Sequence, residues 1–311
     1  MQNHSLTASG GGQNANFNMS GGYFEQGGIS LASNFKRYSF KINSDAKVGK
    51  RIRIGESLNL SFTDRLIESE AGKSAPLIAP SNAPFIPIYD KGDYAVINAA
   101  NAGDAASQAV QIIGINDLAN NEIRVLSRRM LGSVYAEVDL LEGLKFKTRA
   151  GVDFVAGQGS LLSNSYDFGS VFNEAILQVV SKPIELTTNI TNTLTYTKSF
   201  KNVNLTLLVG HEETNFEFDK LRGQGSGFVS NGVTLVNTAA TSSVIQEEDN
   251  WALRGYMGRA NVNIKNKYLL TATIRRDATS RFSKDNRAAI FPSFSVGWKL
   301  DKTPFIQEIR A

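Results

Sequence analysis

The chain has 311 residues, with 33 basic and 29 acidic side chains, no cysteine and two histidines. This near balance of charge does not indicate a nucleic-acid groove, so we expect no nucleic-acid partner. The absence of cysteine excludes a disulfide framework and a thiolate zinc site, and two histidines offer little imidazole for metal binding or acid–base work. No segment approaches the roughly 18 uninterrupted apolar residues of a membrane-spanning helix, so passage through a membrane would require strands.

A repeat of two residues dominates the chain and predicts β-strands, because successive side chains of a strand point to opposite faces. In 35–48, Tyr38 and Phe40 alternate with Arg37 and Lys41. A helix would spread these apolar positions around its whole circumference, so we predict an all-β chain. About eleven strand-like segments recur, at 3–9, 14–25, 35–48, 51–63, 125–140, 143–154, 184–197, 203–211, 250–264, 267–275 and 292–300.

The connections between these segments alternate between short turns and longer polar links, which is typical of a transmembrane barrel with periplasmic turns and extracellular loops. The 65–123 link carries four of the seven prolines and is expected to form a folded extracellular lid. Tight turns are expected at 10–12, 49–50, 142–143, 200–202 and 266–267, and the links at 26–34, 65–123, 156–183, 219–249 and 277–290.

The charged rows opposite the apolar rows are expected to line a wide hydrated lumen. A soluble β-sandwich also alternates, but it gives no reason for two classes of connection length or for such dense charge. The expected lumen-facing residues are Arg37, Lys41, Arg51, Arg53, Lys145, Lys147, Arg149 and Asp153. The aromatic residues expected to form interfacial girdles near strand ends are Tyr23, Tyr38, Phe62, Phe154, Tyr196, Tyr268 and Trp298.

The segment 267–300 contains Arg276-Asp277, Arg281-Phe282, Phe291-Pro292-Ser293, Ser295 and Gly297-Trp298 at the spacing of a specific family signature. It resembles the SusC/RagA family of TonB-dependent outer-membrane receptors, from which it departs at Ala278-Thr279-Ser280, where the family usually has Gly-Ser-Ser. The resemblance implies a barrel of about 22 strands around a plug. We therefore expect residues 1–311 to be part of one barrel domain, with the plug and the terminal strands outside it.

The same resemblance implies TonB-dependent import of glycan oligomers or peptides across a Gram-negative outer membrane, without a cofactor. It also implies a SusD-like surface lipoprotein as partner, contact with TonB–ExbB–ExbD through the plug region, and surrounding outer-membrane lipid. The alternative function is that of a passive outer-membrane porin.

Several fragments resemble catalytic motifs, yet none has the required geometry, so we do not expect an enzyme. Ser44-Asp45-Ala46-Lys47 fits S-x-x-K, but residues three apart in a strand face opposite sides. His211-Glu212-Glu213 lacks the second histidine of a zinc protease motif.

Two sets of residues are candidate ligand contacts. Asp277, with Arg276 and Arg281 close in sequence, is either a contact at a loop base or a structural latch that fixes the 277–290 loop. In the longest link, Tyr89, Asp90, Asp93 and Tyr94 either stack on sugar rings and bind their hydroxyls or pack the loop on itself. Both alternatives stay open at this stage.

Overall fold

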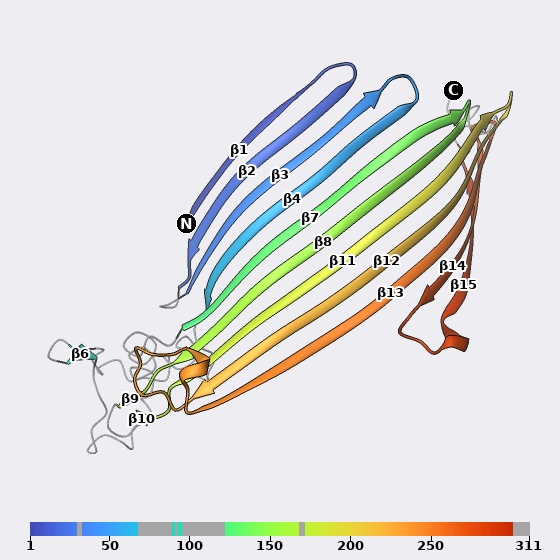
Figure 1. The fold of residues 1–311 in the computed structure, drawn as a ribbon. Helices are drawn as coiled ribbons and strands as arrows, with labels where there is room; N and C mark the ends of the chain where they lie inside the picture. Colours follow the sequence, from blue (N-terminus) through green and yellow to red (C-terminus); the bar gives the residue numbers. More distant parts are fainter. Residues whose placement is uncertain (30–32, 68–88, 91–92, 95–121, 168–171, 301–311) are drawn as a thin grey trace.

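The computed structural model describes residues 1–29, 33–67, 89–90, 93–94, 122–167 and 172–300. Eleven strands form one antiparallel sheet in chain order, as Figure 1 shows, so the prediction of an all-β chain with about eleven strands is confirmed. The strands of the sheet are β1 (Gln2–Gly11), β2 (Ala15–Gly27), β3 (Asn34–Val48), β4 (Ile52–Ile67), β7 (Glu122–Leu141), β8 (Leu144–Ser163), β11 (Leu177–Ser199), β12 (Val203–Ser226), β13 (Thr241–Ile264), β14 (Tyr268–Thr279) and β15 (Ala288–Trp298).

The remaining elements are short. Two-residue strands form two separate hairpins, and two 3-10 turns lie in the links that follow β12 and β14. No helix of the described residues is long and apolar enough to cross a membrane. These short elements are β5 (Tyr89–Asp90), β6 (Asp93–Tyr94), β9 (Tyr166–Asp167), β10 (Phe172–Asn173), η3 (Val236–Thr238) and η4 (Lys284–Asn286).

Tight turns join the strands at one end of the sheet, the upper right end in Figure 1. The first turn occupies 12–14 and not the predicted 10–12, because Gly10 and Gly11 still pair with Phe17 and Asn16, and the other four lie within one residue of their predicted positions. Gly49 and Gly143 adopt φ values of 68° and 79°, a region that glycine enters without the steric cost of a Cβ. The turn between β13 and β14 places Lys265 and Asn266 at φ values of 51° and 52°. Two consecutive positive φ values match the twist of a two-stranded hairpin.

The longer links lie at the opposite end of the strands, and they are shorter than predicted, two of them by more than ten residues. The sequence pattern predicted links at 156–183 and 219–249, whereas β8 and β11 leave only 164–176 between them, and β12 and β13 leave only 227–240. At the start of β13, residues 241–249 are mostly polar on both faces, so the alternation that reveals a strand is weak there although backbone pairing with β12 continues. The predicted 65–123 lid falls mostly outside the described residues.

The described parts of the links 164–176 and 227–240 contact each other through Ser165 and Asn231. The Ser165 N–H donates to Asn231 Oδ1 at 3.1 Å, and Asn231 Nδ2 donates to the Ser165 carbonyl at 3.4 Å. Ile176 and Phe228 are only 4% and 8% exposed. This end of the sheet therefore carries a small folded cluster with its own buried residues.

Strand register keeps the two faces of the sheet chemically distinct. Tyr38 lies opposite Phe62 and Phe40 opposite Leu60, while Lys41 lies opposite Asn59. Because directly opposed residues share a face, each row of like side chains continues from strand to strand. We call the face that carries Phe40 and Leu60 the apolar face, and the face that carries Lys41 and Asn59 the polar face.

Candidate functional site

The polar face collects the predicted lumen residues. Seven of them lie on strands and share this face, namely Arg37, Lys41, Arg53, Lys145, Lys147, Arg149 and Asp153. Arg51 instead lies in the tight turn before β4, where its carbonyl accepts a hydrogen bond from the Asp139 N–H at 2.8 Å. That this face lines a lumen stays a prediction.

A groove of about 520 Å³ runs across the polar face from β3 to β12. At the centre of the groove, Gly151 lies between β7 and β11 and contributes no side chain, so a ligand could approach the sheet backbone there. Cations, carboxylates, amides and hydroxyls therefore share one open surface, which suits hydrogen bonding to a polar ligand. The charged and amide residues that line it are Lys41, Asn59, Arg149, Asp153, Asn189 and Glu212.

Ion pairs organise the charge on this face. Arg129 donates to both Asp153 oxygens, from Nε at 2.8 Å and from Nη2 at 2.6 Å. Lys145 Nζ donates to Glu137 Oε1 at 2.7 Å, and Lys147 Nζ lies 3.8 Å from Glu137 Oε2. The bidentate Arg129–Asp153 pair fixes both side chains in a defined orientation, which single-point contacts do not.

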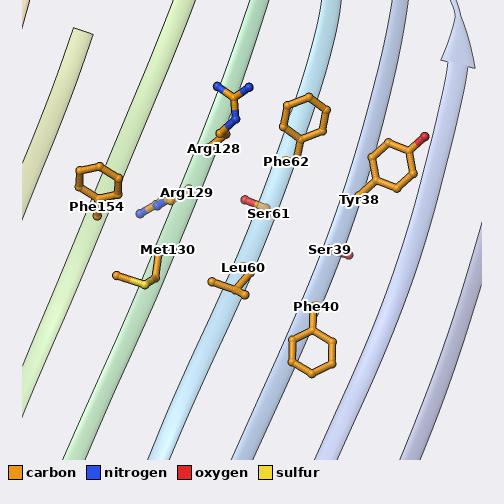
Figure 2. A pocket seen from close by; sticks show the side chains of 10 residues that line it. All are labelled: Tyr38, Ser39, Phe40, Leu60, Ser61, Phe62, Arg128, Arg129, Met130 and Phe154. Carbon is orange, nitrogen blue, oxygen red and sulfur yellow. The ribbon is translucent and has the colours of Figure 1, made fainter.

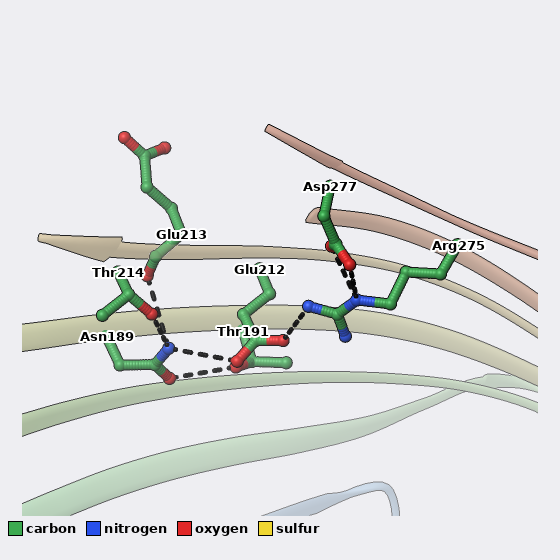
Figure 3. Close-up of polar contacts among 7 residues, drawn as sticks. All are labelled: Asn189, Thr191, Glu212, Glu213, Thr214, Arg275 and Asp277. Atoms are coloured by element: carbon green, nitrogen blue, oxygen red, sulfur yellow. Dashed lines mark hydrogen bonds and ion pairs between the residues drawn. The ribbon is translucent and has the colours of Figure 1, made fainter. Parts of the chain in front are cut away.

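A second polar cluster joins β12 to β14, as Figure 3 shows. Arg275 Nε lies 2.6 and 2.8 Å from the two Asp277 oxygens, and Arg275 Nη2 donates to Glu212 Oε2 at 3.1 Å. Gly255 lies beside this pair on β13, and a Cβ there would come within 2.7 Å of Asp277 Oδ1. The glycine therefore makes room for the two charged side chains against the sheet.

The cluster continues from Glu212 onto β11 through neutral groups. Asn189 Nδ2 donates to Thr214 Oγ1 at 2.9 Å and lies 3.4 Å from Glu212 Oε1. Thr191 Oγ1 donates to Asn189 Oδ1 at 3.1 Å. Charged and neutral hydrogen-bonding groups thus form one network across β11, β12 and β14 (Figure 3).

The predicted grouping of Asp277 with Arg276 and Arg281 differs from the observed pairing. Arg276 lies on the apolar face, opposite Tyr256 and Ile290, because adjacent residues of a strand point in opposite directions. Arg281 Nη2 lies 2.5 Å from Asp249 Oδ2 on β13. Asp277 pairs with Arg275, two residues earlier on the same face, and the proposed roles of these residues as ligand contact or latch stay predictions.

The other predicted contacts lie in the long link. The backbones of Tyr89–Asp90 and Asp93–Tyr94 pair as a two-residue hairpin. The side chains of Tyr89, Asp90, Asp93 and Tyr94 lie outside what the structure describes.

An aromatic pair on the polar face was not anticipated from the sequence. The rings of Phe216 and Trp251 stack with centroids 5.1 Å apart and planes at 17°, and the Arg281 guanidinium carbon lies 5.8 Å from the Trp251 ring centroid. Phe216 lies on the part of β12 beyond the predicted 203–211 strand. Extending the predicted 203–211 strand by five residues would have included Phe216, whereas Trp251 already lies in the predicted 250–264 strand.

On the apolar face, aromatic side chains form a row near the long-link end of the sheet. The ring centroids of His4 and Tyr23 lie 6.3 Å apart, those of Tyr23 and Tyr38 lie 5.0 Å apart, and those of Tyr38 and Phe62 lie 6.2 Å apart. We call this the aromatic row. At the tight-turn end, the rings of Tyr268 and Trp298 stack at 6.4 Å. Aromatic residues therefore lie near both ends of the apolar stripe.

Residues 81–307 match the family described as TonB dependent receptor-like, beta-barrel. The chain belongs to this family. It is 29% identical to TonB-dependent receptor P3 of Formosa agariphila over 99% of the chain and 31% of that relative. It is 26% identical to TonB-dependent receptor SusC of Bacteroides thetaiotaomicron over 98% of the chain and 32% of that relative.

The fold also matches solved structures. The RagAB peptide transporter superposes with a TM-score of 0.82 at 24% identity, covering 98% of the chain and 34% of that structure. The ferric citrate transporter FecA superposes with a TM-score of 0.60 at 11% identity, covering 97% of the chain and 39% of that structure. The chain thus spans about a third of the length of the curated relatives it matches. The predicted membership in the SusC/RagA type of TonB-dependent receptor is confirmed.

Proposed function

We propose that this chain forms a section of an outer-membrane transport barrel that imports nutrients in a TonB-dependent manner. The observation that carries the proposal is the sharp division of the sheet into an apolar and a polar face. An apolar face around the outside of a barrel meets lipid, and a polar face on the inside surrounds a hydrated path.

The height of the apolar stripe agrees with a bilayer. On β4 the stripe runs from Ile52 to Phe62. At a rise of about 3.3 Å per residue this row is about 33 Å long, and a strand tilt of about 40° reduces its height to about 25 Å, the value for outer-membrane barrels. Glu56 is the exception within the stripe, and Ser44 Oγ of the neighbouring strand donates to its Oε1 at 3.2 Å.

The chemistry of the polar face favours neutral polar substrates. The groove is lined by two cations, Lys41 and Arg149, and two carboxylates, Asp153 and Glu212, so it presents balanced charge together with hydroxyls and amides. Glycan oligomers and peptides both match such a surface through hydrogen bonds. RagAB is described as a peptide transporter, and we keep both substrate classes in the proposal.

The proposal includes the partners that such an importer requires. A SusD-like surface lipoprotein would act at the long-link end, where the folded cluster of links 164–176 and 227–240 lies. TonB–ExbB–ExbD would act on a plug region from the opposite side of the membrane. A passive porin needs neither partner, which gives the alternative a clear experimental signature.

Membrane placement is tested with nitroxide labels on the full-length protein in lipid vesicles. For labels at Phe40 and Phe146 on the apolar face, lipid-soluble oxygen is expected to accelerate the relaxation of the nitroxide spin. For labels at Lys41 and Lys147 on the polar face, a water-soluble paramagnetic reagent is expected to accelerate this relaxation. Equal accessibility of both sets would contradict the assignment of the two faces.

Energy dependence is tested by substrate uptake in cells that produce the full-length protein. Collapse of the proton-motive force, or deletion of TonB, is expected to abolish uptake of the cognate oligomer while surface binding persists. Uptake that continues under both conditions would select the porin.

A further inference from the structure

A groove of about 650 Å³ opens on the apolar face across β3, β4, β7 and β8, as Figure 2 shows. Phe40, Leu60 and Met130 line it and remain 41%, 38% and 37% exposed, although their strands lie between paired neighbours within the sheet. Phe154 lies beside Met130 on the adjacent strand. The groove is therefore an open, mainly apolar hollow on this face within the sheet and is not a feature of an unpaired edge.

A cation lies at the long-link end of this groove. Arg128 faces the apolar side opposite Phe62, and its guanidinium carbon lies 5.5 Å from the Phe62 ring centroid. Its neighbour Arg129 faces the polar side and pairs with Asp153. Within the described part of the chain, no carboxylate forms an ion pair with Arg128, whose side chain is exposed.

Arg128 lies at the boundary between the apolar residues and the charged residues of the apolar face. Beyond the aromatic row, the same face carries the ion pairs Lys36–Glu25 at 3.1 Å and Arg124–Asp64 at 2.6 Å. On the other side of Arg128 the face is apolar through Met130 and Leu60. This boundary corresponds to the level of lipid head groups in an outer-membrane barrel.

We propose that this groove binds a phosphate-bearing lipid, with an acyl chain along Phe40, Leu60 and Met130 and the phosphate against Arg128. A neutral lipid would bring no counter-charge to the guanidinium, and free phosphate would leave the apolar groove empty. Arginine and phosphate form charge-assisted hydrogen bonds, which makes the phosphate the matching head group. The inference rests on the membrane placement proposed above, and it adds a specific lipid site to it.

The test compares two lipids with identical dipalmitoyl chains, phosphatidic acid and diacylglycerol, by native mass spectrometry of the full-length protein in mild detergent. Arg128→Gln is expected to weaken the binding of phosphatidic acid about fivefold, which is the effect of one arginine near a lipid surface. The binding of diacylglycerol is expected to stay unchanged. Met130→Trp, which fills the groove, is expected to weaken both lipids. Arg128→Lys, which retains the charge, is expected to restore most of the preference for phosphate.

Arg129→Gln is the matched control, because it removes the adjacent arginine from the opposite face and is expected to change neither lipid. Equal binding of the two lipids to the unmodified protein, or an equal loss in Arg129→Gln, would overturn the proposal. If Arg128→Gln or Met130→Trp dissociates a dimer of the protein and leaves the number of bound lipids unchanged, the proposal is also overturned. A second copy of the chain, and not a lipid, would then occupy the groove. A nitroxide at Phe146, outside the groove, reports membrane placement separately, so lipid contact there without phosphate preference refutes only this inference.

Discussion

Arg275 is expected to stabilise the barrel through its two carboxylate partners, whereas its sequence neighbour Arg276 is not. Arg275→Met keeps the aliphatic volume of the side chain but leaves Glu212 and Asp277 without their shared cation. Two uncompensated carboxylates then lie on the same side of the sheet. Arg276→Met is the control, because Arg276 faces the apolar side.

The size of the effect follows from the exposure of the three side chains. Arg275, Glu212 and Asp277 are 39%, 33% and 35% exposed, so solvent screens both ion pairs. Exposed pairs contribute about 0.2 to 1 kcal/mol each, and the short contacts to Asp277 place this pair at the upper end of that range. We therefore expect Arg275→Met to cost about 1 to 2 kcal/mol and Arg276→Met to change stability by less than about 0.5 kcal/mol.

The measurement is the free energy of unfolding of full-length protein in lipid vesicles, from urea titrations with tryptophan fluorescence as the signal. A double-mutant cycle with Asp277→Asn isolates the pairwise term, which should be about 1 kcal/mol. Equal losses in Arg275→Met and Arg276→Met, or additive effects in the cycle, would refute the observed pairing and restore the Arg276–Asp277 grouping predicted from the sequence.

Three further predictions concern the same face and the links. Gly255→Ala is expected to displace Asp277, because the new Cβ would lie 2.7 Å from its Oδ1, and to cost about 1 kcal/mol in the same urea titration. Tyr89→Ala and Tyr94→Ala are expected to weaken ligand binding by about 1 kcal/mol each in calorimetry, with heat-modifiable mobility of the barrel unchanged. Arg281→Gln is expected to speed protease cleavage of the 280–287 link more than Asp277→Ala does, since Arg281 ties this link to β13.

Much of the wall was predictable from the sequence because opposite faces of the sheet carry opposite chemistry. The segments 35–48 and 51–63 agree closely with β3 (Asn34–Val48) and β4 (Ile52–Ile67). The prediction fails where both faces are polar, as at the start of β13, where residues 241–250 carry mostly hydroxyl, amide and acidic side chains. Backbone pairing with β12 continues there without any apolar stripe to reveal it.

The candidate site was less predictable because its contacts depend on register between distant strands. Glu212 and Arg275 are 63 residues apart, and no local spacing indicates that they meet. The Arg275–Asp277 contact is different, since residues two apart share a face of a strand. The predicted strand ended at 275 and left Asp277 in the 277–290 link, whereas β14 continues to Thr279; extending the period of two over these residues would have selected Arg275 over Arg276 as the partner of Asp277.

The adjacent arginines of β7 show how the division of the sheet assigns different chemistry to the same residue type. On the polar face, Arg129 meets Asp153 in a bidentate pair supplied by the chain itself. On the apolar face, Arg128 lies over Phe62, with a carboxylate partner absent among the described residues. A guanidinium beside an apolar groove is costly unless an anion or water reaches it. In the lipid site proposed above, the phosphate supplies that anion and the acyl chain of the same lipid occupies the apolar groove.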